Sequence, residues 1–142
     1  QGCPRRCPGC HNPDTHAFEE NKLIGVDELF KSIMKPRLGK GVTFSGGEPF
    51  CQAAPFAKLG EKLKAAGIDI LIFTGYEYEE LIKMAKYNES IMRLIKTADY
   101  IVDGKYKEEL RDLSLKFRGS SNQRIIDVKK TLEACKIVEV EF

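Results

Sequence analysis

The stretch from Ile68 to Phe73 constrains the fold of this chain more than any other segment. It is an almost continuous run of apolar residues, interrupted only by Asp69. Such a run is typical of a strand that is buried on both faces of a parallel sheet. Because parallel strands need crossover connections, which are usually helices, the run predicts an α/β fold.

Four other stretches carry apolar residues at the spacing of amphipathic helices. The first is expected to end before Pro36, and the second is expected to stop at Gly67. The four stripes consist of Val26, Leu29, Phe30 and Ile33; Phe56, Leu59 and Leu63; Tyr78, Leu81, Ile82 and Ala85; and Ile91, Leu94, Ile95 and Ala98.

Short strands are predicted between and after these helices. Besides Ile68 to Phe73, the candidates are Val42 to Phe44, Tyr100 to Val102, Ile125 to Val128 and Ile137 to Phe142. The order β-α-β-α-α-β favours a parallel sheet. A length of 142 residues is that of one ordinary domain, so we expect a single domain over residues 1–142.

The charge and hydropathy of the chain exclude two classes of protein. Its formal net charge is only +2, too small for the electrostatic footprint of a general nucleic-acid binder. No apolar stretch approaches the ~18 residues that a membrane span needs. We therefore expect neither nucleic acid nor a membrane among its partners.

Three of the five cysteines lie within eight residues, in Cys3-Pro4-Arg5-Arg6-Cys7-Pro8-Gly9-Cys10. This C-x3-C-x2-C spacing gathers three soft thiolate donors in one loop, and such donors suit iron–sulfur clusters, zinc and copper. A closed zinc site would need a fourth ligand, such as His11 or His16. Three thiolates without a local fourth ligand fit an iron–sulfur cluster with one iron left open. Both alternatives stand at this point.

The other two cysteines, Cys51 and Cys135, are isolated in the sequence. We predict that each is a buried, small apolar side chain and not a ligand. An odd and uneven set of cysteines argues against a disulfide scaffold and favours a reducing compartment, so we expect a cytoplasmic protein.

Further motifs lie where strands are expected to end. In Ser45-Gly46-Gly47-Glu48 the glycines let the backbone approach a ligand and adopt positive φ, and Glu48 adds a carboxylate. Asp103-Gly104-Lys105 lies at the carboxyl end of another strand, the usual ligand side of a parallel sheet. Thr74 and Tyr76 are weaker candidates. An ordinary turn at the end of a strand is an equally good interpretation of each motif.

The C-x3-C-x2-C spacing is the pattern of radical S-adenosylmethionine (SAM) enzymes, and four further segments extend the resemblance. Cys10 to Thr15 resembles the segment after the third cysteine in activases of glycyl radical enzymes, and Ser45 to Pro49 resembles the family's GGE motif. Asp103-Gly104-Lys105 and Leu115 to Arg124 are similar to the activating proteins of anaerobic, class III ribonucleoside-triphosphate reductases. The resemblance runs from Cys3 to about Val128.

Two features depart from the family pattern. Gly9 stands before the third cysteine, where many members carry an aromatic residue. The strand that the family has before its first cysteine has no counterpart ahead of Cys3, which predicts that this first strand is missing from the chain. Apart from that strand, the resemblance implies a partial, open (βα)n barrel of parallel strands of the radical SAM type.

The resemblance implies that a cluster loop, residues 3–12, holds a [4Fe–4S] cluster through Cys3, Cys7 and Cys10, and that the fourth iron binds SAM. Reductive cleavage of SAM would give a 5′-deoxyadenosyl radical that takes a hydrogen from a glycine of the reductase. Glu48 would accept hydrogen bonds from the SAM ammonium. The residues implied in SAM binding are His11, Asn12, Ser45, Gly46, Gly47, Glu48, Asp103 and Lys105. The implied partners are the large subunit of anaerobic ribonucleotide reductase and a one-electron donor such as flavodoxin or ferredoxin.

Residues 104–123 form a long polar connection, which we predict to dock the reductase. The residues expected to make this contact are Arg118, Gly119, Ser120, Ser121, Asn122 and Gln123. One alternative is an activase of pyruvate formate-lyase or of another glycyl radical enzyme, which the stretch from Arg118 to Gln123 disfavours. The other is a non-catalytic zinc or iron–sulfur binding module, which the separate GGE motif disfavours.

Overall fold

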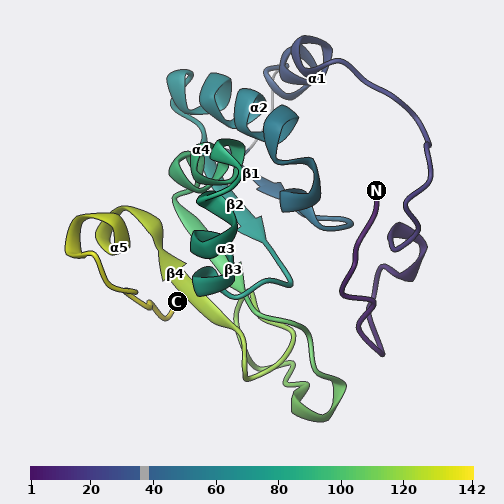
Figure 1. Ribbon diagram of the computed structural model, residues 1–142, viewed down its shortest axis with the longest axis vertical. Helices are drawn as coiled ribbons and strands as arrows, with labels where there is room; N and C mark the ends of the chain where they lie inside the picture. The colour runs from purple at the N-terminus through teal and green to yellow at the C-terminus, as the bar shows by residue number, and fades with distance from the viewer. Residues whose placement is uncertain (36–38) are drawn as a thin grey trace.

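The fold is built on one sheet, which has four strands within the described residues. The computed structural model describes residues 1–35 and 39–142, and the strand order is β1-β2-β3-β4 (Figure 1). Strands β1, β2 and β3 are parallel, and β4 is antiparallel to β3. Their bounds are Gly41–Phe44, Asp69–Phe73, Tyr100–Asp103 and Arg124–Asp127. This open, mostly parallel sheet confirms the predicted α/β class.

The helices α1 to α4 lie where the apolar stripes predict them. Their bounds are Val26–Ile33 for α1, Ala53–Ala65 for α2, Tyr78–Ala85 for α3 and Glu89–Thr97 for α4. Gly67 follows α2 with φ +75°, as expected of a residue that stops a helix. The predicted stop at Pro36 lies outside the described residues. Short 3₁₀ turns are η1 (Pro13–Thr15), η2 (Pro49–Gln52) and η3 (Glu108–Leu110).

The core lies between one face of the sheet and the helices α2, α3 and α4. Alternate strand residues such as Phe44, Ile70 and Ile72 pack into it. Leu71 and Phe73, which point to the other face of β2, are only half-buried. The prediction that β2 is buried on both faces is therefore wrong, because its second face borders a cavity instead of a layer of helices.

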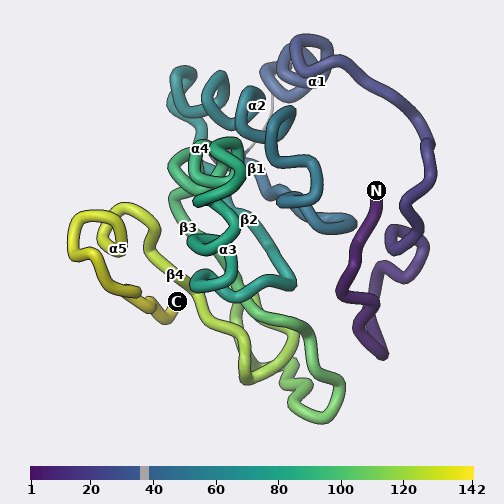
Figure 2. The backbone as a smooth tube through the Cα atoms, in the orientation of Figure 1, coloured from purple at the N-terminus to yellow at the C-terminus, as the bar shows by residue number. Residues whose placement is uncertain are grey.

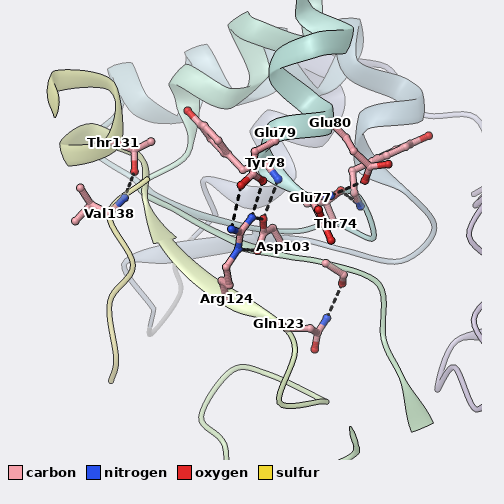
Figure 3. A network of polar contacts seen from close by, with 12 residues as sticks. Thr74, Glu77, Tyr78, Glu79, Glu80, Asp103, Gln123, Arg124, Thr131 and Val138 are labelled. Carbon is pink, nitrogen blue, oxygen red and sulfur yellow. Dashed lines mark hydrogen bonds and ion pairs between the residues drawn. The ribbon is translucent and has the colours of Figure 1, made fainter. Parts of the chain in front are cut away.

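The end of the chain differs from the prediction in two ways. Asp127 ends β4 and caps a helix, α5 (Val128–Ala134), that the sequence analysis missed; its carboxylate accepts a hydrogen bond from the Lys130 N–H at 3.0 Å. Ile137 to Phe142 is not a strand. It lies beside β4 through one isolated bridge, Ile126 to Glu139, and is anchored by the Val138 N–H on the Thr131 hydroxyl (Figure 3).

The connection between β3 and β4 is long, as predicted. Residues 104–123 leave the carboxyl end of β3 and protrude from the body of the molecule (Figure 2). An isolated bridge between Arg111 and Ser120 encloses the outer part of this loop, and the Gln123 amide closes its base on the Gly104 carbonyl. Within the described residues, no helix combines the length and the apolar character needed to cross a membrane.

Candidate functional site

A cavity of about 180 Å³ lies at the carboxyl ends of the parallel strands. The turns after β1, β2 and β3 line it with Ser45 to Glu48, Phe73 to Gly75 and the main chain of Gly104. The N-terminal loop forms the opposite wall through Cys3, Arg5, Cys7, Cys10, His11 and Asn12. The structure therefore brings the cysteine motif and the GGE motif to one pocket, although more than 30 residues separate them in the sequence.

The three clustered cysteines are half-buried free thiols that share this pocket. Main-chain hydrogen bonds shape their loop: the Cys3 N–H donates to the His16 carbonyl at 3.1 Å, and the Cys10 N–H donates to the Cys7 carbonyl at 3.2 Å. The Asn12 N–H donates to the Cys10 Sγ at 3.4 Å. Burial raises the pKa of the Cys7 thiol, while the charge of Lys105 acts in the opposite direction.

The donor set decides which metal group fits the pocket. Among residues 1–35 and 39–142, no three Cys, His, Asp or Glu side chains converge closely enough to hold a single metal ion. This geometry gives no support to a closed zinc site. Three soft thiolates that line one cavity without meeting at a point fit a larger group, an iron–sulfur cluster, whose irons take separate ligands.

Glu48 is buried, and its carboxylate organises the ends of β1 and β2. Its Oε1 accepts hydrogen bonds from the Phe50 N–H at 3.1 Å and the Thr74 hydroxyl at 2.8 Å, and its Oε2 accepts one from the Gly75 N–H at 2.8 Å. Burial raises the pKa of this carboxyl, and the hydrogen bonds counteract the shift. These contacts show that Glu48 has a structural role. Its contact with SAM stays a prediction.

The two glycines of the GGE motif have different roles. Gly46 has φ +101°, in the region that favours glycine, as predicted. Gly47 is packed against the main chain of Gly2. The sequence predicts that a ligand approaches the main chain closely here. At Gly47 it is the N-terminal segment of the chain itself that does so.

Asp103 lies outside the lining of the pocket, and its side chain is 1% exposed. Its carboxylate accepts hydrogen bonds from the Arg124 guanidinium and from the Tyr78 N–H, at 2.8 Å for the latter (Figure 3). Arg124 also pairs with Glu79. Lys105 is exposed. Of the predicted Asp103-Gly104-Lys105 motif, the structure brings only the Gly104 main chain to the pocket.

The residues from Arg118 to Gln123 fold the 104–123 loop onto itself. The Gln123 amide accepts from the Gly119 N–H at 2.9 Å and donates to the Gly104 carbonyl at 3.0 Å. The Asn122 amide donates to the Lys105 carbonyl at 2.8 Å, and Ser120 is fully buried. Arg118 pairs with Glu141 and is largely buried, whereas Ser121 is exposed. These contacts are internal, and docking of a partner through this stretch stays a prediction.

Several residues of the pocket were missed or misjudged from the sequence. Arg5, Phe73 and Tyr106 line the cavity, and of these only Arg5 lies within a motif. The prediction that Cys51 and Cys135 are buried is wrong, since both are exposed. In η2 it is the neighbouring Phe50 that packs into the core, and Cys135 follows α5 in the left-handed conformation with φ +52°.

Comparison with known proteins places the chain in a family. Residues 1–126 match the model of a 4Fe-4S single cluster domain. The chain belongs to the 4Fe-4S single cluster domain family. The predicted [4Fe–4S] cofactor agrees with the family's description, and the three thiols that line the pocket are donors of the type that such a cofactor takes.

Relatives of this single-cluster domain are named activating proteins. The anaerobic ribonucleoside-triphosphate reductase-activating protein of Escherichia coli K12 is 34% identical over 130 residues, which make up 86% of this chain and 80% of that protein. The protein of the same name from Enterobacteria phage T4 is 31% identical over 131 residues, or 87% and 78% of the two chains. The pyruvate formate-lyase-activating enzyme of Clostridium pasteurianum is 38% identical over 105 residues, which are 70% of this chain and 44% of that enzyme. The resemblance to activases of glycyl radical enzymes is confirmed.

Proposed function

We propose that this protein activates an anaerobic ribonucleoside-triphosphate reductase by generating a glycyl radical on it. Cys3, Cys7 and Cys10 would hold a [4Fe–4S] cluster, and SAM would bind beside it. The observation that carries the proposal is that three free thiols share one cavity with the turns after β1, β2 and β3. Relatives in E. coli and phage T4, of which the match covers 80% and 78%, are named as activating proteins of this reductase, which supports it as the target.

A bound [4Fe–4S] cluster and SAM would supply the chemistry, namely one-electron cleavage of SAM, with the electron from a donor such as flavodoxin or ferredoxin, and removal of a hydrogen atom from a glycine of the reductase. The residues of the chain bind and orient the reactants. His11 and Asn12 lie on the wall of the cluster loop, and Ser45 to Glu48 lie on the wall of the sheet. SAM would therefore bind between these two walls.

The Glu48 carboxylate has an acceptor position left for a hydrogen bond from the SAM ammonium. A carboxylate offers about four acceptor positions. Three donors of the chain occupy three of them, from Phe50, Thr74 and Gly75. Because Glu48 lines the pocket, its fourth acceptor position would take a hydrogen bond from the ligand. The three internal hydrogen bonds would hold the carboxylate in a fixed orientation.

We also assign the fold to the partial, open barrel of the radical SAM type, as one domain. The support is the parallel order of β1, β2 and β3, with a pocket lined by the residues that follow all three. The antiparallel β4 ends this order, so the described sheet does not close on itself.

A second hollow, of about 450 Å³, adjoins the pocket and extends toward the 104–123 loop. It shares Cys10, Phe73 and Gln123 with the pocket and continues to Arg111 and Leu113. We infer that the reductase docks on this loop. Residues 104–123 carry five Lys or Arg against three Asp or Glu, so the loop favours an acidic surface on the partner.

The exposed side chains of the loop identify the better test of docking. Leu113 is 83% exposed, whereas Arg118 is engaged by Glu141 of the C-terminal segment. Leu113→Ser should weaken binding to the reductase without unfolding the protein. Tyr87→Ser removes another exposed apolar side chain, outside the loop, and serves as the matched control. Equal affinity of the two variants in a titration against the purified reductase would contradict docking at Leu113.

The second candidate function is activation of pyruvate formate-lyase. It is favoured by the 38% identity to the Clostridium enzyme, but the matched segment covers only 44% of that enzyme. A non-catalytic zinc module has no support in the geometry, because no three suitable side chains among the described residues converge on a single ion.

One experiment separates these functions. Purified protein is reconstituted under anaerobic conditions, its iron and sulfide are measured, and 5′-deoxyadenosine is assayed after a reductant and SAM are added. About four irons per chain with SAM cleavage are expected. Adding either reductase or lyase, and recording the electron paramagnetic resonance (EPR) signal of a glycyl radical, identifies the target. Bound zinc without SAM cleavage would overturn the proposal.

A further inference from the structure

Arg5 lies inside the cysteine motif, two residues from both Cys3 and Cys7, and its side chain reaches out of the cluster loop to α3. Its Nη2 donates to the Glu80 Oε2 at 2.5 Å. The guanidinium carbon also lies 4.2 Å from the centre of the Tyr76 ring, in a cation–π contact. Two different elements beyond the end of β2 thus hold one side chain of the loop.

The receiving carboxylate is itself fixed in place. The Glu80 Oε2 accepts a hydrogen bond from the Glu77 N–H at 2.8 Å as part of a capping box at the start of α3 (Figure 3). Because α3 packs on the core through Leu81, its first turn is a rigid support. Arg5 therefore connects the cluster loop, which is rich in Pro and Gly and forms no helix or strand before Pro13, to a helix that packs on the core.

Gly75 provides the space through which Arg5 passes. A methyl group added to Gly75 would lie 2.6 Å from the Arg5 Cγ. The Gly75 N–H donates to Glu48, so its main chain has little freedom to move aside. The end of β2 is therefore shaped to accommodate the stem of Arg5.

We propose that Arg5 is a positioning residue for the cluster, which acts by fixing the cluster loop on the start of α3. The inference rests on the proposed function, in that Cys3 and Cys7 are taken as cluster ligands. A loop with three ligands retains a cluster only while the ligands keep their relative positions, and groups outside the ligand set that orient ligands contribute about 10–100-fold to metal affinity. Arg5 lies between two of the ligands and has the contacts for this role.

The test compares variants of the full chain after anaerobic reconstitution. The measured quantities are the rate of iron loss to bathophenanthroline disulfonate, the EPR spectrum of the reduced cluster, and the melting temperature of the cluster-free protein. Arg5→Ala and Glu80→Gln should lose iron about tenfold faster than the wild type, the size of effect expected when a group that orients metal ligands is removed, and should broaden the EPR spectrum. Arg5→Lys keeps the charge but not the planar fork, so an intermediate rate is expected.

Arg93→Ala is the matched control. Arg93 pairs with Glu61 through two hydrogen bonds of 2.9 Å, between α4 and α2 and away from the pocket, so it is another Arg–Glu pair that joins two parts of the chain. This variant should lose iron at the rate of the wild type. Gly75→Ala should accelerate iron loss in the wild type and add nothing in the Arg5→Ala background, because the side chain it displaces is then absent.

Each outcome is decisive. Wild-type iron retention in Arg5→Ala would overturn the inference and leave the proposed function intact. Equal acceleration in Arg93→Ala would also overturn it, since the effect would then be one of general stability. A wild-type protein that takes up no iron and sulfide would overturn the proposed function itself.

Discussion

The α-carbon of Gly47 lies directly against the main chain of Gly2. A methyl group added to Gly47 would lie 2.5 Å from the Gly2 carbonyl oxygen, and the Glu48 N–H donates to that same oxygen at 2.8 Å. Because Cys3 follows Gly2, this contact fixes the point at which the cluster loop starts on the end of β1.

Gly47→Ala is expected to displace the N-terminal segment. Overpacking of this kind costs about 1–3 kcal/mol in free energy of unfolding, and displacement of Cys3 should lower the iron taken up on reconstitution. Urea denaturation and iron analysis measure the two effects. At Gly25, the N-cap of α1, an added methyl group meets no atom within 4 Å, so Gly25→Ala should leave iron uptake unchanged. Equal iron uptake in the two variants would contradict the contact.

Arg124→Ala is expected to be strongly destabilising, because it leaves the buried carboxylate of Asp103 without its cation. Breaking a buried ion pair on one side costs about 3–5 kcal/mol. The Glu79 side chain on the same guanidinium is 51% exposed, so Glu79→Ala should cost less than about 1 kcal/mol. Thermal unfolding measures both, and Asp103→Asn should restore part of the stability of Arg124→Ala. Similar losses in the two single variants would rule out the buried charge as the cause.

Tyr76 should ionise late on an alkaline titration. Burial, followed by the nearby Cys51 and Glu48, raises the pKa of Tyr76 to about 12. Since the ordinary value is about 10, this tyrosine stabilises the fold below pH ~10, and its contribution is lost as the pH rises toward 12. The phenolate absorbance of the wild type minus that of Tyr76→Phe gives the titration of Tyr76 alone. A midpoint near 10 would contradict the buried environment.

Glu80 should titrate differently when Arg5 is removed. The hydrogen bond from Arg5 holds the pKa of Glu80 below its ordinary value. The stabilisation is therefore present above the ordinary pKa of about 4.3 and is lost as the pH falls through the lowered value. It is modest, because the Glu80 side chain is 44% exposed. In Arg5→Ala the carboxyl resonance, followed by carbon-13 nuclear magnetic resonance, should titrate at a higher pH, whereas Arg93→Ala should leave it unchanged.

Local pattern predicts the helices and parallel strands of this protein well, because each apolar stripe packs on the same core. The helix α5 was missed for a specific reason. Its seven residues are too few for a clear period, and its cap, Asp127, also ends a strand. Ile137 to Phe142 alternates like a strand but has only one bridge to its neighbour, so alternation alone did not make it one.

The candidate site divides in the same way. The GGE motif lines the pocket as its position after a strand indicates, and the cysteine motif lines the same pocket. Contacts between distant residues were not accessible from local pattern: Arg5 and Glu80 are 75 residues apart, and Asp103 turns to Arg124 and not to the pocket. Tertiary packing decides which way a polar side chain at the end of a strand points. The residues next to it in the sequence do not predict that direction.

The unequal exposure of the five thiols has a practical consequence. Cys51 and Cys135 are exposed, whereas Cys3, Cys7 and Cys10 are half-buried around the pocket. Alkylation followed by mass spectrometry should thus modify the first two rapidly, whatever occupies the pocket. The extent of labelling at the other three then becomes a footprint of the pocket, obtained without a spectroscopic probe or a catalytic assay.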